Sequence, residues 1–152
     1  MSSKIFTFKV SLVNGLYCPA KGEEIFRVTE VRGEKSLYDF AETIVGLFGF
    51  DFDHAFGFYN NIKNIYMSDE LYELFFDVPG CEATEGAKSV ELTKIEDVFK
   101  IGKKMGFLFD YGDDWVFLVE CKKISDSIPK CRYPRIVEKV GESPEQYPSW
   151  DG

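Results

Sequence analysis

An alternation of apolar and polar residues near the start of the chain predicts a half-buried β-strand. A period of two over residues 4–13 is typical of a strand with one buried face. The expected buried side chains occupy the even positions, namely Phe6, Phe8, Val10 and Leu12. Asn14-Gly15 is a turn signal, and residues 24–31 are the next strand candidate.

A helical period follows and predicts an α-helix over residues 37–48. Apolar residues recur three and four positions apart, at Leu37, Phe40, Ile44, Leu47 and Phe48. Ser36 is a suitable N-cap with Asp39 three residues later, and Gly49 is well placed to end the helix.

The middle of the chain gives weaker signals. Phe56 and Phe58 indicate short strands. Residues 71–78 could form a short helix that begins at Ser68 and ends at Pro79-Gly80, and residues 81–89 resemble a loop. A second short helix is expected from Thr93, as its N-cap, to Ile101.

The two most apolar segments, residues 106–111 and 115–124, predict a β-hairpin in the centre of the sheet. After them, four prolines make residues 125–152 a largely irregular tail. The order of elements predicts a single α+β domain over residues 1–152. We expect a mixed or antiparallel sheet with a C-terminal hairpin, backed by two or three helices.

Composition supports a packed protein and limits its partners. The chain is 45% hydrophobic and 16% aromatic, which favours a folded core over disorder. The formal net charge of −8 disfavours nonspecific binding to phosphate backbones. Residues 94–139 hold 10 basic and 8 acidic side chains, so a local basic patch is still compatible with the sequence.

The cysteine pattern and the N-terminus favour a cytoplasmic protein. Cys18, Cys81, Cys121 and Cys131 are far apart and form no CxxC pair, which argues against a structural zinc ribbon. Neither a secretion signal nor an apolar run long enough for a membrane span is apparent. We expect reduced, mostly buried thiols, no cofactor and no membrane partner.

The hairpin turn gathers carboxylates that have two interpretations. Asp110, Asp113 and Asp114 are close enough to bind Ca²⁺ or Mg²⁺, although the spacing is not that of an EF-hand. The alternative is turn chemistry, since Asp and Gly are common turn residues. Asp110 shares a strand face with Leu108 and needs a partner if that face is covered, for which we suggest Arg135.

His54 is the only histidine, so any Ser–His or Cys–His catalytic pair must use it. The alternative is a structural residue that is held by hydrogen bonds. The sequence contains no nucleophile elbow, phosphate loop, dinucleotide fingerprint or zinc-protease helix. An enzyme is therefore not favoured.

Trp115 could be a stacking platform for a ligand, together with Tyr111, Tyr133, Tyr147 and Trp150. Basic residues nearby would suit single-stranded nucleic acid, namely Lys122, Lys123, Lys130, Arg132, Arg135 and Lys139. The alternative is a core tryptophan, because Phe117 and Val119 share its strand face.

Three segments together resemble one known family. They are residues 53–58 (DHAFGF), 109–115 (FDYGDDW) and 133–148 (YPRIVEKVGESPEQYP). Their order and motifs resemble the plasmid ORF-three-like family, small proteins also found as passengers of insertion elements. Asp114 stands where that family usually has Gly. Ile136 and Ser143 stand where many members have cysteine, so a metal role of those cysteines does not transfer.

The resemblance implies a single-domain α+β fold and an association with mobile elements, with no established activity. Our first hypothesis is a non-enzymatic binding module for a protein partner. We expect its surface where the hairpin turn meets the Tyr133–Pro148 tail, with binding residues Tyr111, Asp113, Trp115, Tyr133 and Arg135. A metal-assisted hydrolase using His54 and the hairpin carboxylates is the alternative. A nucleic-acid-binding accessory protein is the third option, which the net charge disfavours.

Overall fold

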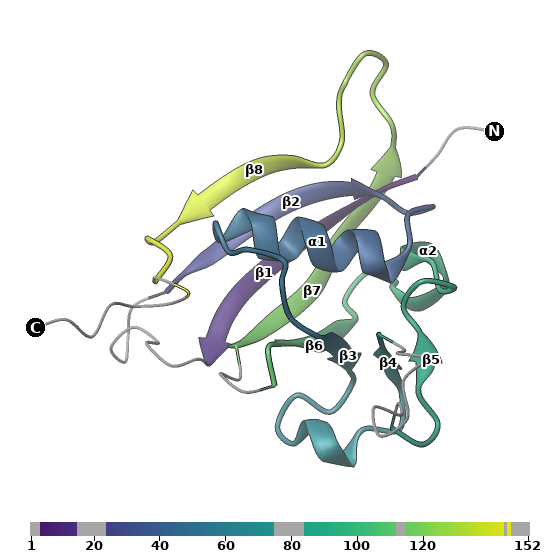
Figure 1. The fold of residues 1–152 in the computed structure, drawn as a ribbon. Helices are drawn as coiled ribbons and strands as arrows, with labels where there is room; N and C mark the ends of the chain where they lie inside the picture. The colour runs from purple at the N-terminus through teal and green to yellow at the C-terminus, as the bar shows by residue number, and fades with distance from the viewer. Residues whose placement is uncertain (1–3, 15–23, 75–83, 112–114, 145, 147–152) are drawn as a thin grey trace, which may run out of the picture.

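A single sheet of eight strands dominates the computed structural model, which describes residues 4–14, 24–74, 84–111, 115–144 and 146 (Figure 1). The strand order is β5-β4-β3-β6-β7-β1-β2-β8. The strands are β1 (Lys4–Asn14), β2 (Phe26–Arg32), β3 (Phe56–Tyr59), β4 (Leu71–Glu73), β5 (Lys88–Ser89), β6 (Lys104–Phe109), β7 (Trp115–Asp126) and β8 (Arg135–Val140). The helices are α1 (Leu37–Leu47), the single turn α2 (Ile95–Val98) and the 3-10 turn η1 (Ile65–Met67).

The predicted fold class is wrong. The structure is 43% strand and 15% helix, with two α-helices in the described part of the chain, so it is mostly a β protein. The segment expected to form a helix after Ser68 contains β4 instead, because its backbone pairs with β3 (Phe58 opposite Tyr72). The rest of that predicted helix, with Pro79-Gly80, lies outside the described residues. Pairing with a distant strand has overridden a weak local helical signal.

Several predicted elements are confirmed. The hairpin strands β6 and β7 are antiparallel neighbours in the middle of the sheet. Asp39 donates its backbone N–H to the Ser36 hydroxyl at the start of α1. Gly49, just after the end of α1, has φ +72°, the left-handed conformation that glycine adopts readily. The expected strand over residues 24–31 is β2.

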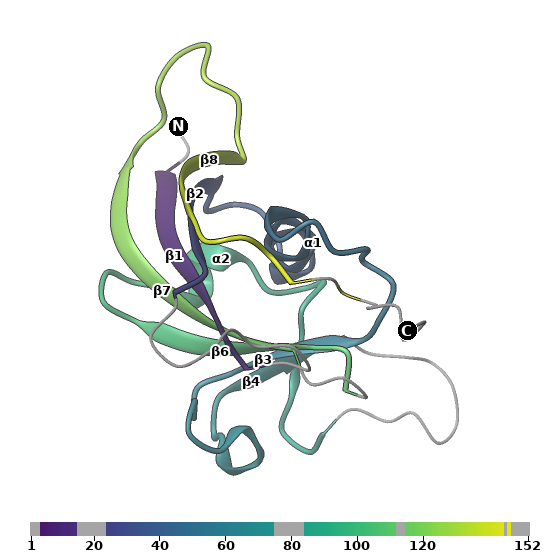
Figure 2. The same ribbon diagram turned by 90° about the vertical axis from the view of Figure 1, so that its left-hand side faces the viewer.

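The sheet curves around α1, which packs on its concave face (Figure 2). Two register shifts between β1 and β7 mark bulges, and bulges bend and twist strands. The four apolar side chains predicted to be buried in β1 (Phe6, Phe8, Val10 and Leu12) are buried, and Ile5 is buried as well. The core between sheet and helix is aromatic and includes Phe8, Phe40, Phe58, Phe107 and Phe117.

The proline-containing tail has more regular structure than the sequence indicated. β8 pairs antiparallel with β2 and becomes the last strand of the sheet. It begins directly after the cis peptide bond between Tyr133 and Pro134. The prolines flank the strand and leave its interior free, which is why they do not prevent it.

A buried arginine joins β2, α1 and the end of β8. Arg27 is fully buried and packs its guanidinium 4.9 Å from the centre of the Phe48 ring. It donates hydrogen bonds to the backbone carbonyl oxygens of Leu47, Phe26 and Val140 and to the hydroxyl of Ser143. Within the described ranges, none of the helices is long and apolar enough to cross a membrane.

Candidate functional site

The sheet separates the predicted binding residues into two groups. Arg135 lies opposite Glu30 and Val140 lies opposite Phe26, so β8 runs away from Tyr133 toward the end of the sheet that carries the hairpin turn. Phe26 pairs with Ser11, whose other neighbour is Leu118 near the start of β7. Tyr133 and Arg135 therefore lie at the opposite end of the sheet from Tyr111.

His54 and Asp110 meet at the hairpin end. Nε2 of His54 lies 3.3 Å from Oδ2 of Asp110 and 3.5 Å from Oδ1 of Asp53. The Asp110 side chain is 9% exposed, whereas the His54 side chain is 38% exposed. Asp110 has φ +66°, a conformation that is unfavourable for most residues other than glycine and that is tolerated better by Asp and Asn.

The far end of the tail reaches this cluster through Gln146. Its side-chain amide accepts a hydrogen bond from the backbone N–H of Asp51 and donates to the Asp51 carbonyl and to Oδ1 of Asp53. Gln146 is 8% exposed, so these contacts fix the tail against the segment that carries His54. The tail thus contacts the segment before His54 through Gln146, whereas Tyr133 and Arg135 lie at the other end of the sheet.

Tyr111 belongs to a chain of hydrogen bonds on the convex face of the sheet. Its hydroxyl lies 2.8 Å from that of Tyr59, which donates to the buried carboxylate of Glu73. Either hydroxyl can be the donor in the contact between the two tyrosines. Thr84 completes the cluster by donating its backbone N–H and its hydroxyl to Glu73.

The environment keeps both tyrosines protonated. Burial raises the pKa of Tyr111 to about 12; the hydrogen bond with Tyr59 lowers this pKa and the Glu73 charge raises it. Burial also raises the pKa of Tyr59, with the bond to Glu73 acting in the same direction. Tyr111 as a whole residue is 43% exposed.

Trp115 lies in the core and has no exposed surface. Its ring centre is 4.8 Å from that of Phe50, and its Nε1 has no hydrogen-bond partner among the described residues. A ring in this position cannot stack on a ligand from solution. Asp113, Asp114, Tyr147 and Trp150 fall outside the described residues.

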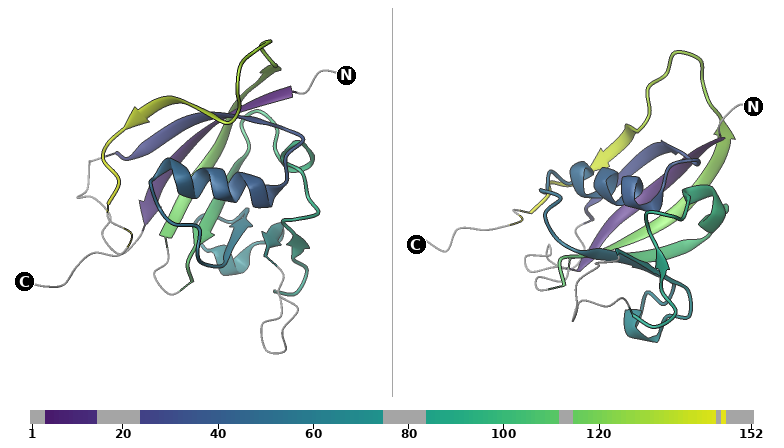
Figure 3. Two further views of the ribbon diagram at one scale, coloured as in Figure 1. Left: turned by 45° about the horizontal axis from the view of Figure 1, so that its top comes forward. Right: turned by 45° about the vertical axis from the view of Figure 1, so that its right-hand side comes forward.

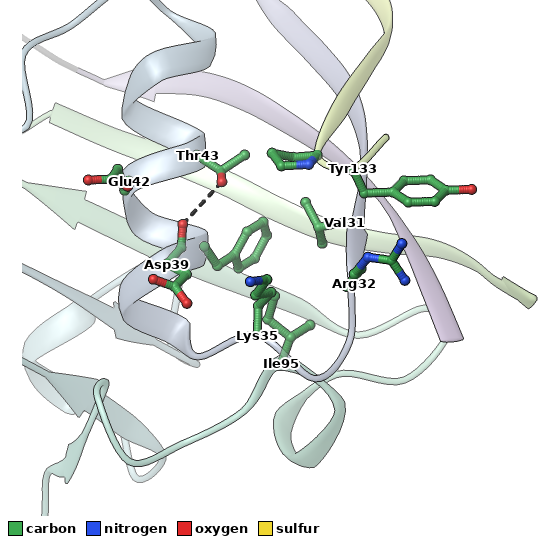
Figure 4. A pocket seen from close by; sticks show the side chains of 10 residues that line it. Val31, Arg32, Lys35, Asp39, Glu42, Thr43, Ile95 and Tyr133 are labelled. Atoms are coloured by element: carbon green, nitrogen blue, oxygen red, sulfur yellow. Dashed lines mark hydrogen bonds between the residues drawn. The ribbon is translucent and has the colours of Figure 1, made fainter. Parts of the chain in front are cut away.

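A pocket of about 250 Å³ lies beside Tyr133, and we call it the Tyr133 pocket (Figure 4). Its floor is formed by apolar side chains of Val31, Phe40 and Ile95. The rim carries charged and polar side chains from the end of β2 and from α1, namely Arg32, Lys35, Asp39, Glu42 and Thr43, and Tyr133 and Pro134 close the remaining side.

Contacts hold the Tyr133 side of this pocket in place. The guanidinium of Arg32 lies 5.1 Å from the centre of the Tyr133 ring, and the Tyr133 hydroxyl accepts the backbone N–H of Ile128. Arg135 pairs with Glu30, with 2.5 Å between Nε and Oε1. The suggestion that Arg135 is the partner of Asp110 is therefore wrong, because β8 holds it at the other end of the sheet.

Within the described residues, no group of three or more His, Cys, Asp or Glu side chains is arranged to hold a metal ion. Cys121 is buried and burial raises the pKa of its thiol to about 11, whereas Cys131 is partly exposed. Cys18 and Cys81 lie outside these residues.

Sequence reasoning missed the α1 side of the Tyr133 pocket and the Tyr59–Glu73 pair. Asp39, Glu42 and Thr43 are ordinary polar positions of an amphipathic helix, and they line a pocket only because Tyr133 and Pro134 lie opposite them. The position of Tyr59 could have been predicted from the sequence. Its number is odd whereas those of Phe56 and Phe58 are even, so its side chain is expected on the opposite face of the sheet.

These features define a class of small mostly-β proteins in which one curved sheet wraps its main helix, α1. The chain belongs to the plasmid pRiA4b ORF-3-like protein family, whose model matches residues 4–147. Its fold is similar to the crystal structure of the protein of unknown function MM3350 from Methanosarcina mazei Go1. The TM-score is 0.73 at 19% sequence identity, over 94% of this chain and 72% of that one. No curated protein matches the sequence.

Proposed function

We propose that the protein is a non-enzymatic binding module whose docking site is the Tyr133 pocket. The observation that supports this most directly is the pocket itself, which combines an apolar floor with a charged rim. A few polar groups around an apolar base are typical of sites that recognise another molecule. Tyr133 and Arg32 add a preformed aromatic wall, and ordered aromatic and arginine side chains are common binding hot spots.

The size of the pocket favours a side chain of a partner protein over a cofactor. Its volume of about 250 Å³ falls below the roughly 300–1,000 Å³ of typical small-molecule sites. A single Leu, Met or Phe side chain of a partner is a better match. The partner would then bury this anchor while its flanking residues contact the rim.

The charges on the rim restrict how such a partner lies. Arg32 and Lys35 belong to the end of β2 and the turn after it, whereas Asp39 and Glu42 project from α1. A peptide with its apolar anchor between an acidic and a basic residue would match both sides. Matched charges at a rim act mainly on association rate and on orientation.

The test is selection of a random peptide library on the immobilised protein. We expect peptides with a bulky apolar anchor to be enriched on the wild type. The double variant Tyr133→Ala/Arg135→Ala should lose these peptides and remain folded, because Arg135 is exposed and Tyr133 is only partly buried. Thr43→Trp, which fills the pocket from the α1 side, should lose them as well.

Leu92→Ala is the matched control, because Leu92 is 88% exposed and lies outside the pocket. It should retain every enriched peptide. Enrichment that persists on a folded double variant and on Thr43→Trp would remove the Tyr133 pocket as the docking site.

A hydrolase that uses His54 and Asp110 is the second candidate function. The observation in its favour is the 3.3 Å contact between the two side chains, since a buried carboxylate can orient a histidine for proton transfer. Titration of the protein with Zn²⁺ and Mn²⁺ by calorimetry tests the metal-assisted form. Binding that is lost in both His54→Ala and Asp110→Asn would support it, and no heat of binding would remove it.

A further inference from the structure

β8 is an edge strand whose second side is open within the described part of the chain. It pairs with β2 and lies at the edge of the sheet (Figure 3). One row of its backbone N–H and C=O groups therefore faces away from the sheet. Unpaired backbone groups on an edge are a template for another strand. An extended peptide that pairs with such an edge is a common mode of recognition.

The side chains of β8 are unusually exposed for a strand with apolar residues. Five of its six residues are exposed and the sixth is partly buried. Ile136 and Val137 are each 53% exposed. Ile136 lies opposite Thr29 and Glu138 lies opposite Val28, which leaves Val137 as the additional residue of a bulge. These two side chains offer apolar contact to a strand that would lie alongside.

The charge around this edge is basic although the protein as a whole is acidic. Lys130, Arg132, Arg135 and Lys139 are exposed and lie within ten residues that contain one acidic side chain, Glu138. Glu30 neutralises Arg135 from β2 and leaves the segment with an excess of positive charge. An acidic strand would therefore be favoured over a basic one.

The same charges disfavour pairing of β8 with a second copy of itself. In a two-fold antiparallel pair centred on Val137, Arg135 would face Lys139 of the second copy. In a pair centred on Glu138, the two Glu138 side chains would face each other. Like charges directly opposite destabilise strand pairs. In these two registers the charges therefore act against self-association, whereas an acidic strand would meet Arg135 and Lys139 with the opposite charge.

We propose that the partner of this protein docks as an extended, acidic strand that pairs with the free edge of β8. This rests on the proposed function, because β8 starts beside Tyr133 and Pro134, so one partner segment could fill the Tyr133 pocket and continue along the strand. The partner class is thus an acidic peptide with alternating apolar residues, recognised through its backbone and its charge.

The test uses a defined probe, the capped hexapeptide EVELEV, with KVKLKV as the control of opposite charge. Amide hydrogen exchange of the full-length protein is followed by NMR at residues 135–140. We expect saturating EVELEV to slow exchange of the outward-facing amides of β8 about tenfold, because they become hydrogen-bonded. KVKLKV should leave their exchange unchanged.

Two further comparisons separate strand pairing from simple charge attraction. Two N-methylated versions of EVELEV are compared, one methylated at its odd residues and the other at its even residues, and both keep every side chain. One of the two should abolish the protection, because its methyl groups replace the N–H donors that would pair with β8. Lys139→Glu should weaken EVELEV binding about fivefold, as expected for reversal of an exposed charge. Lys63→Glu, an exposed charge outside β8, is the matched control and should change nothing.

Each other outcome overturns the proposal. Protection that both N-methylated phases retain would show charge attraction without strand pairing. Slow exchange in β8 that grows with protein concentration, together with a dimer in sedimentation, would identify a second copy as the occupant. If EVELEV gives no protection while library peptides still bind the wild type and fail to bind Thr43→Trp, strand addition is rejected and the Tyr133 pocket is still supported as the docking site. Absence of both would reject the two proposals together.

Discussion

Nε2 of His54 lies 3.3 Å from Oδ2 of Asp110, and the two residues come from segments that are far apart in the sequence. Asp110 is the first residue after β6 and holds a left-handed backbone with φ +66°. Its backbone N–H donates to the Ala55 carbonyl, next to His54. The side chain and the backbone of one aspartate thus both attach the His54 segment to the end of the hairpin strand.

The backbone of Asp110 leads to a prediction about stability. Asp110→Ala should be less stable than Asp110→Gly by about 1 kcal/mol, because alanine tolerates a left-handed conformation poorly and glycine adopts it freely. Both variants lose the contact with His54, so their difference reports the backbone alone. The free energy of unfolding from urea denaturation measures it. At the exposed helical position Glu42 the order should reverse, with alanine above glycine.

A second prediction concerns the space that Tyr59 occupies. A Cβ at Gly57 would lie 2.6 Å from the Tyr59 hydroxyl and 2.8 Å from its ring, and hydrogen bonds to Glu73 and Tyr111 hold that ring in place. Gly57→Ala should therefore destabilise the protein by about 1–3 kcal/mol. Gly46→Ala is the control: nothing lies within 4 Å of its Cβ position in α1, so it should stabilise by up to about 1 kcal/mol. Thermal or urea unfolding of both variants measures the contrast, and equal effects would contradict it.

A third prediction concerns Arg27, whose hydrogen-bond partners are neutral oxygens at the end of α1, in β2, at the end of β8 and at Ser143. Arg27→Lys should lower the free energy of unfolding by about 3 kcal/mol. A single ammonium group cannot replace the several donors of the guanidinium, so buried carbonyl oxygens would be left unpaired. Arg32→Lys, on the same strand but partly exposed, should cost less than about 1 kcal/mol. Guanidinium denaturation of both variants compares the losses. A fully tolerated Arg27→Lys would show that packing against Phe48 matters more than the hydrogen bonds.

A fourth prediction follows from the tyrosine pair. The pKa of Tyr111 is raised to about 12 in the folded protein, against about 10 for a free tyrosine, so its protonated form is favoured by folding. This contribution to stability is fully present below pH 10 and is lost as the pH rises from about 10 to about 12, where the unfolded chain ionises first. Urea denaturation across this range should show a steeper fall for the wild type than for Tyr111→Phe. Tyr66→Phe, at an exposed position, should keep the wild-type slope.

The local sequence was sufficient to predict those helices and strands whose pattern lies within one continuous segment. The alternation in residues 4–13 placed Phe6, Phe8, Val10 and Leu12 in the core, because period and burial follow directly from strand geometry. Ser36 and Gly49 marked the ends of α1 for reasons of capping and backbone conformation that need no partner. The apolar hairpin likewise indicated its central place in the sheet.

The tertiary structure decided the short strands and every contact of the candidate sites. β4 has three residues and β5 has two, too few for a period, and they exist because neighbouring strands satisfy their backbone groups. The motifs also did not predict the ion pair between Arg135 of β8 and Glu30 of β2. These residues are 105 positions apart in the sequence and are neighbours only because of the register between the two strands. Composition and periodicity act over a few residues, whereas register and sheet order depend on the whole chain. The sequence by itself therefore determined which faces are buried, and only the folded sheet decided that Tyr133 borders a pocket with α1 while His54 and Asp110 meet at the opposite end.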